Sequence, residues 1–174
     1  MVNEKIHAAR EVTKRISVRV ETWESGDTGA LGLVDEDQVT FYNAPLYRHT
    51  TRSEVRLQNV SKAAQLPRVE VLYAYADVDG ALVDAAVKAG ARGLVIAGFP
   101  TGATSPAMRK ALDQARAQGV VVVMSHRGGL GRTSTRLDFI SADNLTPQKA
   151  RVLLMLAMAR DPAVDAVKKI FASH

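Results

Sequence analysis

Three runs of aliphatic and β-branched residues recur at nearly even spacing in the second part of the chain, and this repeat constrains the fold more than any other feature. The runs begin at Val69, Leu94 and Val120. Apolar residues at helical spacing follow the first two runs, over 79–90 and 105–119. Strands that alternate with helices need crossover connections, so they form a parallel sheet with helices on its faces. The repeat therefore predicts an α/β fold, a three-layer sandwich built on a small parallel sheet.

Capping residues predict where the helices of this domain begin. Asp79 and Ser105 are residue types that cap helix starts, and a glycine lies at the end of both predicted helices. The pairs Thr-Pro and Asp-Pro predict two further helices, over 146–160 and 161–172. Between the third strand and these helices, the segment 125–145 predicts a glycine-rich loop followed by irregular structure.

The first part of the chain has no such repeat. Segments 31–34 and 38–42 predict a β-hairpin, 18–23 an edge strand and 3–9 a short helix. Such a segment cannot bury much surface by itself, so we interpret it as the β-hairpin end of a larger amino-terminal domain. The predicted organisation is that domain end over 1–47, a polar linker over 48–67 and the α/β domain over 68–174.

Composition excludes several kinds of site. The chain has no cysteine, so it can form neither a disulfide nor a cysteine-ligated metal site. Its four histidines share no i, i+4 spacing, and we expect no metal and no other cofactor. The net charge of +5 comes from lysines and arginines spread singly or in pairs along the chain, and this pattern argues against nucleic-acid binding.

Hydrophobic runs are too short for a membrane span. The longest, 152–159, compares with about 20 residues for a spanning helix. The first ten residues carry Glu4, Lys5 and Arg10 where a signal peptide needs an apolar stretch. We therefore expect a soluble protein without membrane contact, in the cytoplasm or the periplasm. The helix predicted over 146–160 is apolar nearly all round, which indicates either a subunit contact or a helix covered within its own domain.

Several segments together resemble one family. NLTPQKARVLLML at 144–156, VEVLYAYAD at 69–77 and LVDAAVKAGARGLVIAG at 82–98 are similar to the carboxy-terminal domain of bacterial, type II-like L-asparaginases and asparaginase-glutaminases. AAREVTK at 8–14 and LGLVDEDQVTFYNAPLYRHT at 31–50 are similar to earlier segments of the same family. The resemblance spans nearly the whole chain.

The resemblance implies an amidohydrolase that converts L-asparagine and water to L-aspartate and ammonia. Lys14 matches the family's catalytic lysine through the letters VTK, and residues 1–47 would then be the end of the catalytic domain. The family's Thr-Gly-Gly-Thr and Gly-Thr-Asp segments, which carry the nucleophile, do not occur in this sequence. We therefore expect this chain to be inactive by itself. Spacing alone favours a different interpretation, in which Lys14 is an exposed basic residue beside Arg15.

The family also completes its active site with a Gly-Asn-Gly loop from a partner subunit, which implies a homodimer or a higher homo-oligomer. This sequence reads GFPTGATS instead and has Thr101 at the asparagine position. By this match Thr101 binds the amino-acid amide substrate, while its local sequence is also that of an ordinary turn before a helix cap. The loop after Arg127 is shortened and has no clear counterpart of the family's later acidic residue.

Two alternatives stay open at this level. The first is a non-catalytic module that dimerises or binds an amino acid through the α/β domain. The second concerns the glycines at 128–131, flanked by Arg127 and Arg132, which would suit a phosphate but do not open directly onto a helix as a phosphate loop does.

Overall fold

The computed structural model describes residues 1–56, 66–134 and 138–174. Its chain divides into two units, Met1–Arg52 and Ser53–His174. The unit boundary falls inside the predicted linker 48–67, much of which lies outside the described residues. Part of the predicted irregular segment, at 135–137, lies outside them as well.

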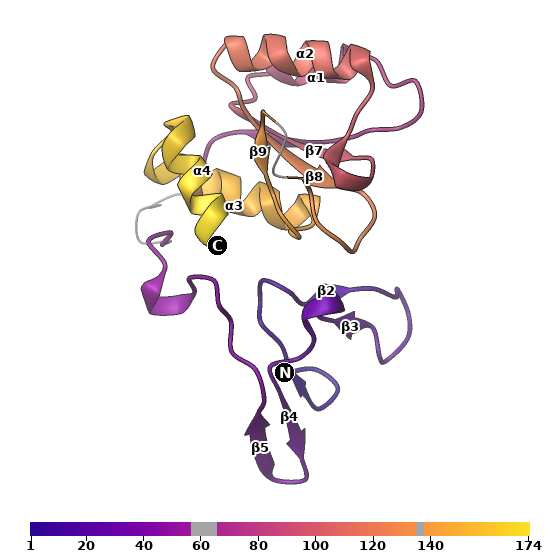
Figure 1. Cartoon of the computed structure of the whole chain (residues 1–174), viewed down its shortest axis with the longest axis vertical. Coiled ribbons are helices and arrows are strands. Elements are labelled where there is room, and N and C mark those ends of the chain that lie inside the picture. Colours follow the sequence, from indigo (N-terminus) through magenta and orange to yellow (C-terminus); the bar gives the residue numbers. More distant parts are fainter. Residues whose placement is uncertain (57–65, 135–137) are drawn as a thin grey trace. The chain divides into compact units, whose positions relative to one another are not determined.

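The second unit is built on a four-stranded parallel sheet in the order β6-β7-β8-β9 (Figure 1). Its strands are β6 (Val69–Tyr73), β7 (Gly93–Gly98), β8 (Val121–His126) and β9 (Ile140–Ser141). Its helices are α1 (Ala81–Lys88), α2 (Pro106–Ala117), α3 (Pro147–Arg160) and α4 (Val164–Ser173), with the short 3-10 turn η5 at Pro100–Gly102. The first three strands and all four helices were predicted from the sequence, whereas β9 was not.

The helices cover both faces of this sheet, as Figure 1 shows for α1 and α2 on one side and α3 and α4 on the other. All six residues of β7 are buried. Leu94 and Ile96 pack into the core beneath α1 and α2, and Val95 packs into the core beneath α3 and α4. A parallel strand buried on both faces needs apolar residues throughout, which is why this segment has no alternation. The predicted α/β three-layer sandwich is confirmed.

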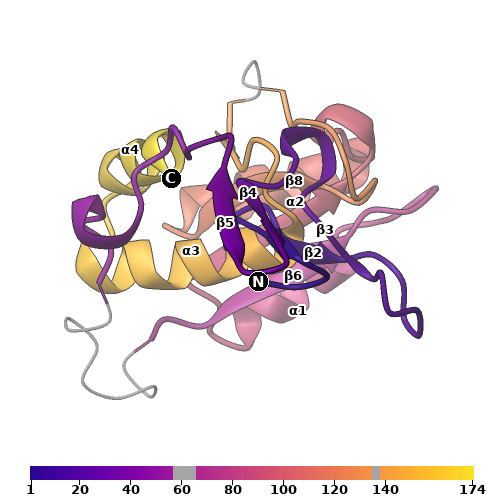
Figure 2. The same ribbon diagram turned by 90° about the horizontal axis from the view of Figure 1, so that it is seen from below.

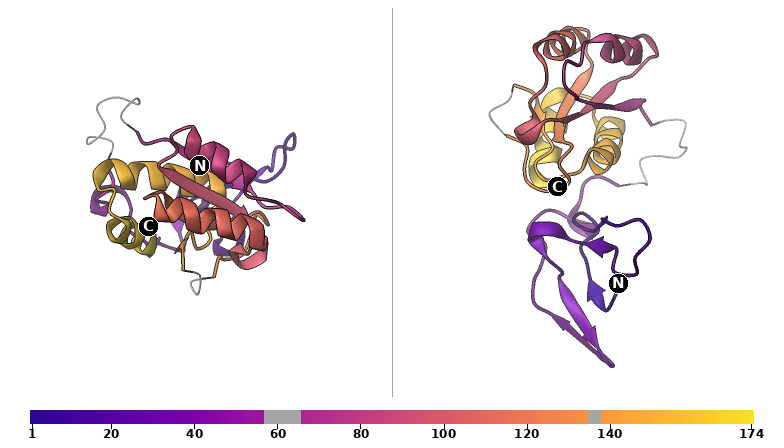
Figure 3. Two further views of the ribbon diagram at one scale, coloured as in Figure 1. Left: turned by 90° about the horizontal axis from the view of Figure 1, so that it is seen from above. Right: turned by 90° about the vertical axis from the view of Figure 1, so that its right-hand side faces the viewer.

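Seen from above, α1 and α2 run side by side over the sheet (Figure 3). Ser105 caps α2 as predicted, because its Oγ accepts from the backbone N–H of Met108 at 3.1 Å. Thr146 likewise caps α3. The cap of α1 differs from the prediction: Gly80 is the N-cap residue, and the Asp79 carboxylate accepts from the N–H of Ala81 at 3.0 Å.

Close approach of α3 to the sheet depends on Gly93. A Cβ added there would lie 2.9 Å from Cδ2 of Leu154 and 3.2 Å from Sδ of Met158, both on α3. Leu154 and Met158 are among the residues of α3 that are buried within its own domain, whereas Val152 remains 50% exposed. Among the described residues, none of the helices combines the length and the apolar character that a membrane span requires.

The first unit consists of short strands. β1 (Lys5–Ile6), β4 (Gly32–Asp35) and β5 (Gln38–Phe41) form an antiparallel sheet in the order β1-β4-β5. β2 (Thr13–Lys14) pairs with β3 (Trp23–Glu24), and the 3-10 turns η1 (Gly26–Thr28) and η2 (Thr50–Arg52) complete the unit. The predicted hairpin is confirmed, and its strands β4 and β5 lie side by side in Figure 2.

Two predictions for this unit are wrong. The segment 3–9 is not a helix, because Lys5 and Ile6 pair with β4 instead. The segment 18–23 is not a strand except at its last residue, and Val18 and Val20 are 90% and 84% exposed. None of the hydrophobic side chains in Met1–Arg52 is buried. This unit therefore has no hydrophobic core of its own.

Candidate functional site

Three loops meet at the carboxyl edge of the parallel sheet. They follow β6, β7 and β8, whose last residues are Tyr73, Gly98 and His126. In open α/β sheets, ligands bind outside this edge because loops and helix starts converge there. The candidate site is therefore assembled from the residues just after these three strands.

The loop after β7 is folded tightly back on its strand. The backbone N–H of Phe99 donates to the carbonyl of Ala103, and that of Gly102 donates to the carbonyl of Phe99, both at 2.8 Å. A Cβ on Gly98 would lie 2.8 Å from the carbonyl oxygen of Ala103. Only glycine leaves room for this turn, so the sequence Gly-Phe-Pro-Thr-Gly fixes the loop that presents Thr101.

Thr101 has an unusual backbone conformation. Its φ of 69° and ψ of 2° place it in the left-handed region, which is a genuine outlier for a β-branched residue. Its side chain is exposed and makes no hydrogen bond to any described residue, while its carbonyl accepts from the N–H of Ser134 at 3.0 Å. Strain of this kind costs of order 1–3 kcal/mol and clusters at functional sites. The strained backbone of Thr101 is therefore consistent with a functional role for this residue.

The two arginines of the glycine-rich loop have partners within the protein. Nη1 of Arg127 donates to the carbonyl of Ala74 at 2.7 Å, and its guanidinium carbon lies 4.7 Å from the centroid of the Phe99 ring. Arg132 forms an ion pair and a hydrogen bond with Asp143. These contacts direct both guanidiniums to neighbouring segments of the fold, which favours a structured surface loop over a phosphate cradle.

Three buried polar side chains near this edge were not singled out from the sequence. Nε2 of His126 and the hydroxyls of Thr104 and Thr133 are buried and have no hydrogen-bond partner among the described residues. His126 is only 4% exposed and ends the apolar strand β8. A histidine that closes a run of valines is the one signal that would have pointed to it. Buried polar atoms of this kind can accept a water or a small polar ligand.

Lys14 lies in the first unit, on β2, opposite Trp23 of β3. Its side chain is exposed and forms no ion pair or hydrogen bond with the described residues. A lysine that moves a proton near neutral pH needs burial and a neighbouring charge. The first unit by itself does not provide that environment. Lys14 lies in the first unit and Thr101 in the second.

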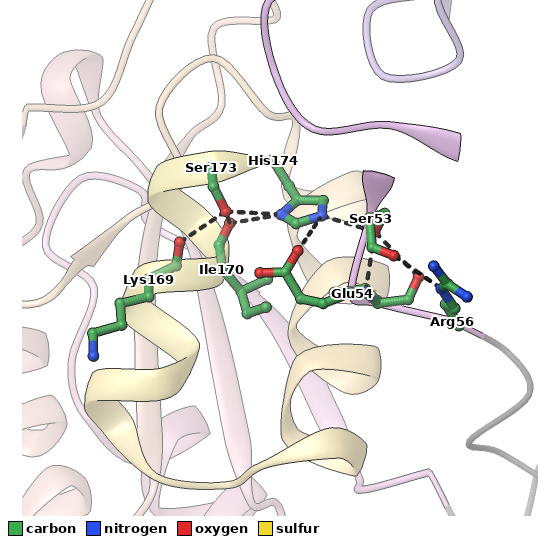
Figure 4. Close-up of polar contacts among 8 residues, drawn as sticks. Ser53, Glu54, Arg56, Lys169, Ile170, Ser173 and His174 are labelled. Atoms are coloured by element: carbon green, nitrogen blue, oxygen red, sulfur yellow. Dashed lines mark hydrogen bonds and ion pairs between the residues drawn. The ribbon is translucent and has the colours of Figure 1, made fainter. Parts of the chain in front are cut away.

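Histidines take part in two other polar contacts. His7 Nδ1 lies 2.7 Å from Ser25 Oγ, and burial, with the charge of Lys5 as a second cause, lowers the pKa of His7 below its ordinary 6.5. In the second unit, Nε2 of His174 lies 2.8 Å from Ser53 Oγ and 3.7 Å from a Glu54 carboxylate oxygen (Figure 4). This second cluster attaches the start of the second unit to the end of α4.

No group of three or more histidine and acidic side chains among the described residues is placed to hold a metal ion.

Comparison with known proteins identifies relatives over the whole chain. Residues 68–171 match the family model described as the Glutaminase/Asparaginase C-terminal domain. The chain is 37% identical to L-asparaginase 2 of Bacillus subtilis over 100% of its own length and 47% of that protein's. It is 31% identical to the glutaminase-asparaginase of Pseudomonas fluorescens, covering 98% of this chain and 48% of the relative. The chain thus spans about half the length of the curated relatives it matches.

A solved structure agrees with these matches. The probable cytoplasmic L-asparaginase from Campylobacter jejuni superposes with a TM-score of 0.92 at 32% identity, over 99% of this chain and 57% of that one. A further relative, 34% identical, is the probable periplasmic L-asparaginase of Haemophilus influenzae, with 94% of this chain and 48% of the relative covered.

Proposed function

Because the chain belongs to the glutaminase/asparaginase family, we propose that it acts as the carboxy-terminal part of an amidohydrolase that converts L-asparagine and water to L-aspartate and ammonia. The observation that carries this proposal is the strained conformation of Thr101 at the carboxyl edge of the sheet. In the proposed match to the family, that residue takes the place of the substrate-binding asparagine. Its exposed hydroxyl is free of hydrogen bonds to the described residues, so it can donate one to the bound amino-acid amide.

Lys14 is the proposed proton-transfer residue. Its amine would take a proton from the attacking hydroxyl, and this step requires that its environment disfavour the charged form. Apolar surface already lies beside it, because Trp23 on the paired strand is 39% exposed. Covering this surface with the amino-terminal half of the family fold would desolvate Lys14 and supply the nucleophile. The chain by itself is therefore expected to be inactive.

The exposed apolar side chains of the first unit support the proposal that it belongs to a larger catalytic domain. This unit has no buried hydrophobic side chain, and Val39 and Phe41 on β5 are 59% and 63% exposed. Neighbouring exposed apolar side chains of this kind are typical of a surface that another part of a fold covers. We therefore propose that residues 1–47 complete a larger catalytic domain and that residues 48–67 link it to the α/β domain at 68–174.

The test is ammonia release with L-asparagine and L-glutamine as separate substrates. The purified chain should release none. A fusion of the amino-terminal half of the Bacillus subtilis relative to this chain should release ammonia, and Lys14→Ala should abolish that activity. Arg15→Ala, which removes the neighbouring positive charge, is the matched control and should leave activity within about twofold.

Two outcomes would contradict the proposal. Turnover by the purified chain that disappears in Lys14→Ala would show that this half suffices for catalysis. A folded fusion that hydrolyses neither amide would instead favour the second candidate, a non-catalytic module that dimerises or binds an amino acid. Half-exposed Val152 on α3 is the observation that favours self-association, and sedimentation of the chain with and without Val152→Lys tests the proposed homodimer.

Both compartments considered from the sequence occur in the names of relatives, one cytoplasmic and one periplasmic. A small amino-acid amide is the proposed partner in either compartment, and neither a nucleic acid nor a membrane is part of the proposed function.

A further inference from the structure

Arg127 begins the third loop of the candidate site and contacts the other two. Its Nη1 donates to the carbonyl of Ala74, the residue after β6, at 2.7 Å. Its backbone N–H donates to the carbonyl of Gly98, the last residue of β7, at 3.0 Å. Its guanidinium carbon lies 4.7 Å from the centre of the Phe99 ring, within the range of a cation–π contact. A residue that itself follows β8 thereby holds the ends of β6 and β7 together.

Phe99 connects this contact to Thr101. Both backbone hydrogen bonds that close the loop involve Phe99, one through its N–H to Ala103 and one through its carbonyl to Gly102. The Phe99 side chain is partly buried against the core beneath α1 and α2. A shift of this ring would move both hydrogen bonds and, with them, Thr101 between them.

We propose that Arg127 is a positioning residue for substrate binding: it holds Phe99, and through Phe99 it keeps Thr101 in the left-handed conformation that presents its hydroxyl. A strained residue keeps its conformation only where the surroundings over-determine it, and Arg127 supplies that constraint from the neighbouring loop. A planar guanidinium can stack on a ring and donate a directed hydrogen bond at the same time, which other side chains do poorly. This inference rests on the proposed function for its effect on substrate.

The kinetic test uses the active fusion described above. Arg127→Ala and Thr101→Ala should each lower kcat/KM by about tenfold, mainly through a higher KM, because both remove the same substrate contact. The double variant should be no more than about threefold worse than either single variant, since coupled residues are not additive. Arg132→Ala, which breaks the Asp143 pair on the same loop, is the control and should change KM by less than about threefold. Additive losses, about a hundredfold in the double variant, would overturn the proposal.

A second readout needs no activity. Amide hydrogen exchange on the chain itself should show the Gly102 N–H exchanging at least about tenfold faster in Arg127→Ala, with α2 unchanged. Arg132→Ala should leave Gly102 unchanged. Unchanged exchange at Gly102 in Arg127→Ala would refute the inference even if activity fell, because Arg127 would then act on substrate directly. If the fusion shows no activity in any form, the proposed function fails, and this exchange measurement alone decides whether Arg127 holds the loop.

Discussion

Replacing the strained residue of the candidate site should make the protein more stable. Thr101 has a φ of 69°, and the left-handed region costs an L-residue roughly 1–2 kcal/mol. Thr101→Gly removes that cost. The greater freedom of glycine in the unfolded chain lowers the free energy of unfolding by about 0.5–1 kcal/mol, which offsets part of this gain. The lost side chain is exposed and forms no hydrogen bond with the described residues, so little else changes. We expect the free energy of unfolding to rise by about 1 kcal/mol.

Urea unfolding followed by circular dichroism measures this change. A gain of about 1 kcal/mol should raise the Tm of a domain of this size by roughly 4 °C and move the urea midpoint without changing the slope. The matched control is Ala103→Gly, two residues later in the same loop, where φ is −69°. There the glycine relieves no strain and should lower the free energy of unfolding by about 0.4–1 kcal/mol.

The opposite signs of these two variants are the decisive result. If Thr101→Gly lowers the free energy of unfolding as Ala103→Gly does, the conformation of Thr101 stores no strain. That conformation would then no longer support a functional role for Thr101. In the active fusion the same Thr101→Gly change should reduce kcat/KM, because the contact of the Thr101 hydroxyl with the substrate is gone. Stability gained and activity lost in one variant is the expected pattern for a strained functional residue.

Three further changes test other parts of the structure. Gly93→Ala should lower the free energy of unfolding by about 1–3 kcal/mol in urea, because the added methyl would press on buried side chains of α3, whereas Gly128→Ala, which would meet nothing closer than 3.7 Å, should have little effect. Ser53→Ala should speed amide exchange of Val55, whose N–H donates to the Ser53 hydroxyl at 3.1 Å, and unchanged exchange would mean that the contact is not formed in solution. The midpoint of His7 in an NMR titration should lie below 6.5, because its pKa is lowered in the folded state. The unfolded state then binds more protons, so the contribution of His7 to stability is complete above about pH 6.5 and is lost as the pH falls through the lower folded value; a midpoint at or above 6.5 would contradict the burial of this side chain.

The α/β domain was predictable because its signals are local and repeated. The strands beginning at Val69, Gly93 and Val121 are apolar runs, the first two are each followed by a helix, and Ser105 and Thr146 cap helices as their types suggest. β9 was not predicted, because a strand of two residues has no periodicity in the sequence. It is defined by its pairing with β8, which is a long-range contact.

The first unit was harder to predict because its short elements depend on their partners. The strand Lys5–Ile6 exists through its pairing with β4, so a local pattern that resembled a helix was misleading. The alternation of Val18 and Val20 correctly marks apolar surface, but nothing in Met1–Arg52 covers these side chains. For the candidate site, the family resemblance pointed to Thr101. The contact between Arg127 and Phe99 could not be predicted from the sequence, because only the folded chain brings these residues together.

The exposed strand of the hairpin has a practical consequence for the chain in solution. Within the described residues of the first unit, β5 has a strand neighbour on one side only, and all four of its residues are exposed. An open edge with Val39 and Phe41 at its surface is a template onto which a strand of another molecule can add, and such addition leads to aggregation. The solubility of the isolated chain should therefore be limited by this one strand, and a lysine in place of Phe41 should raise the concentration at which it stays in solution.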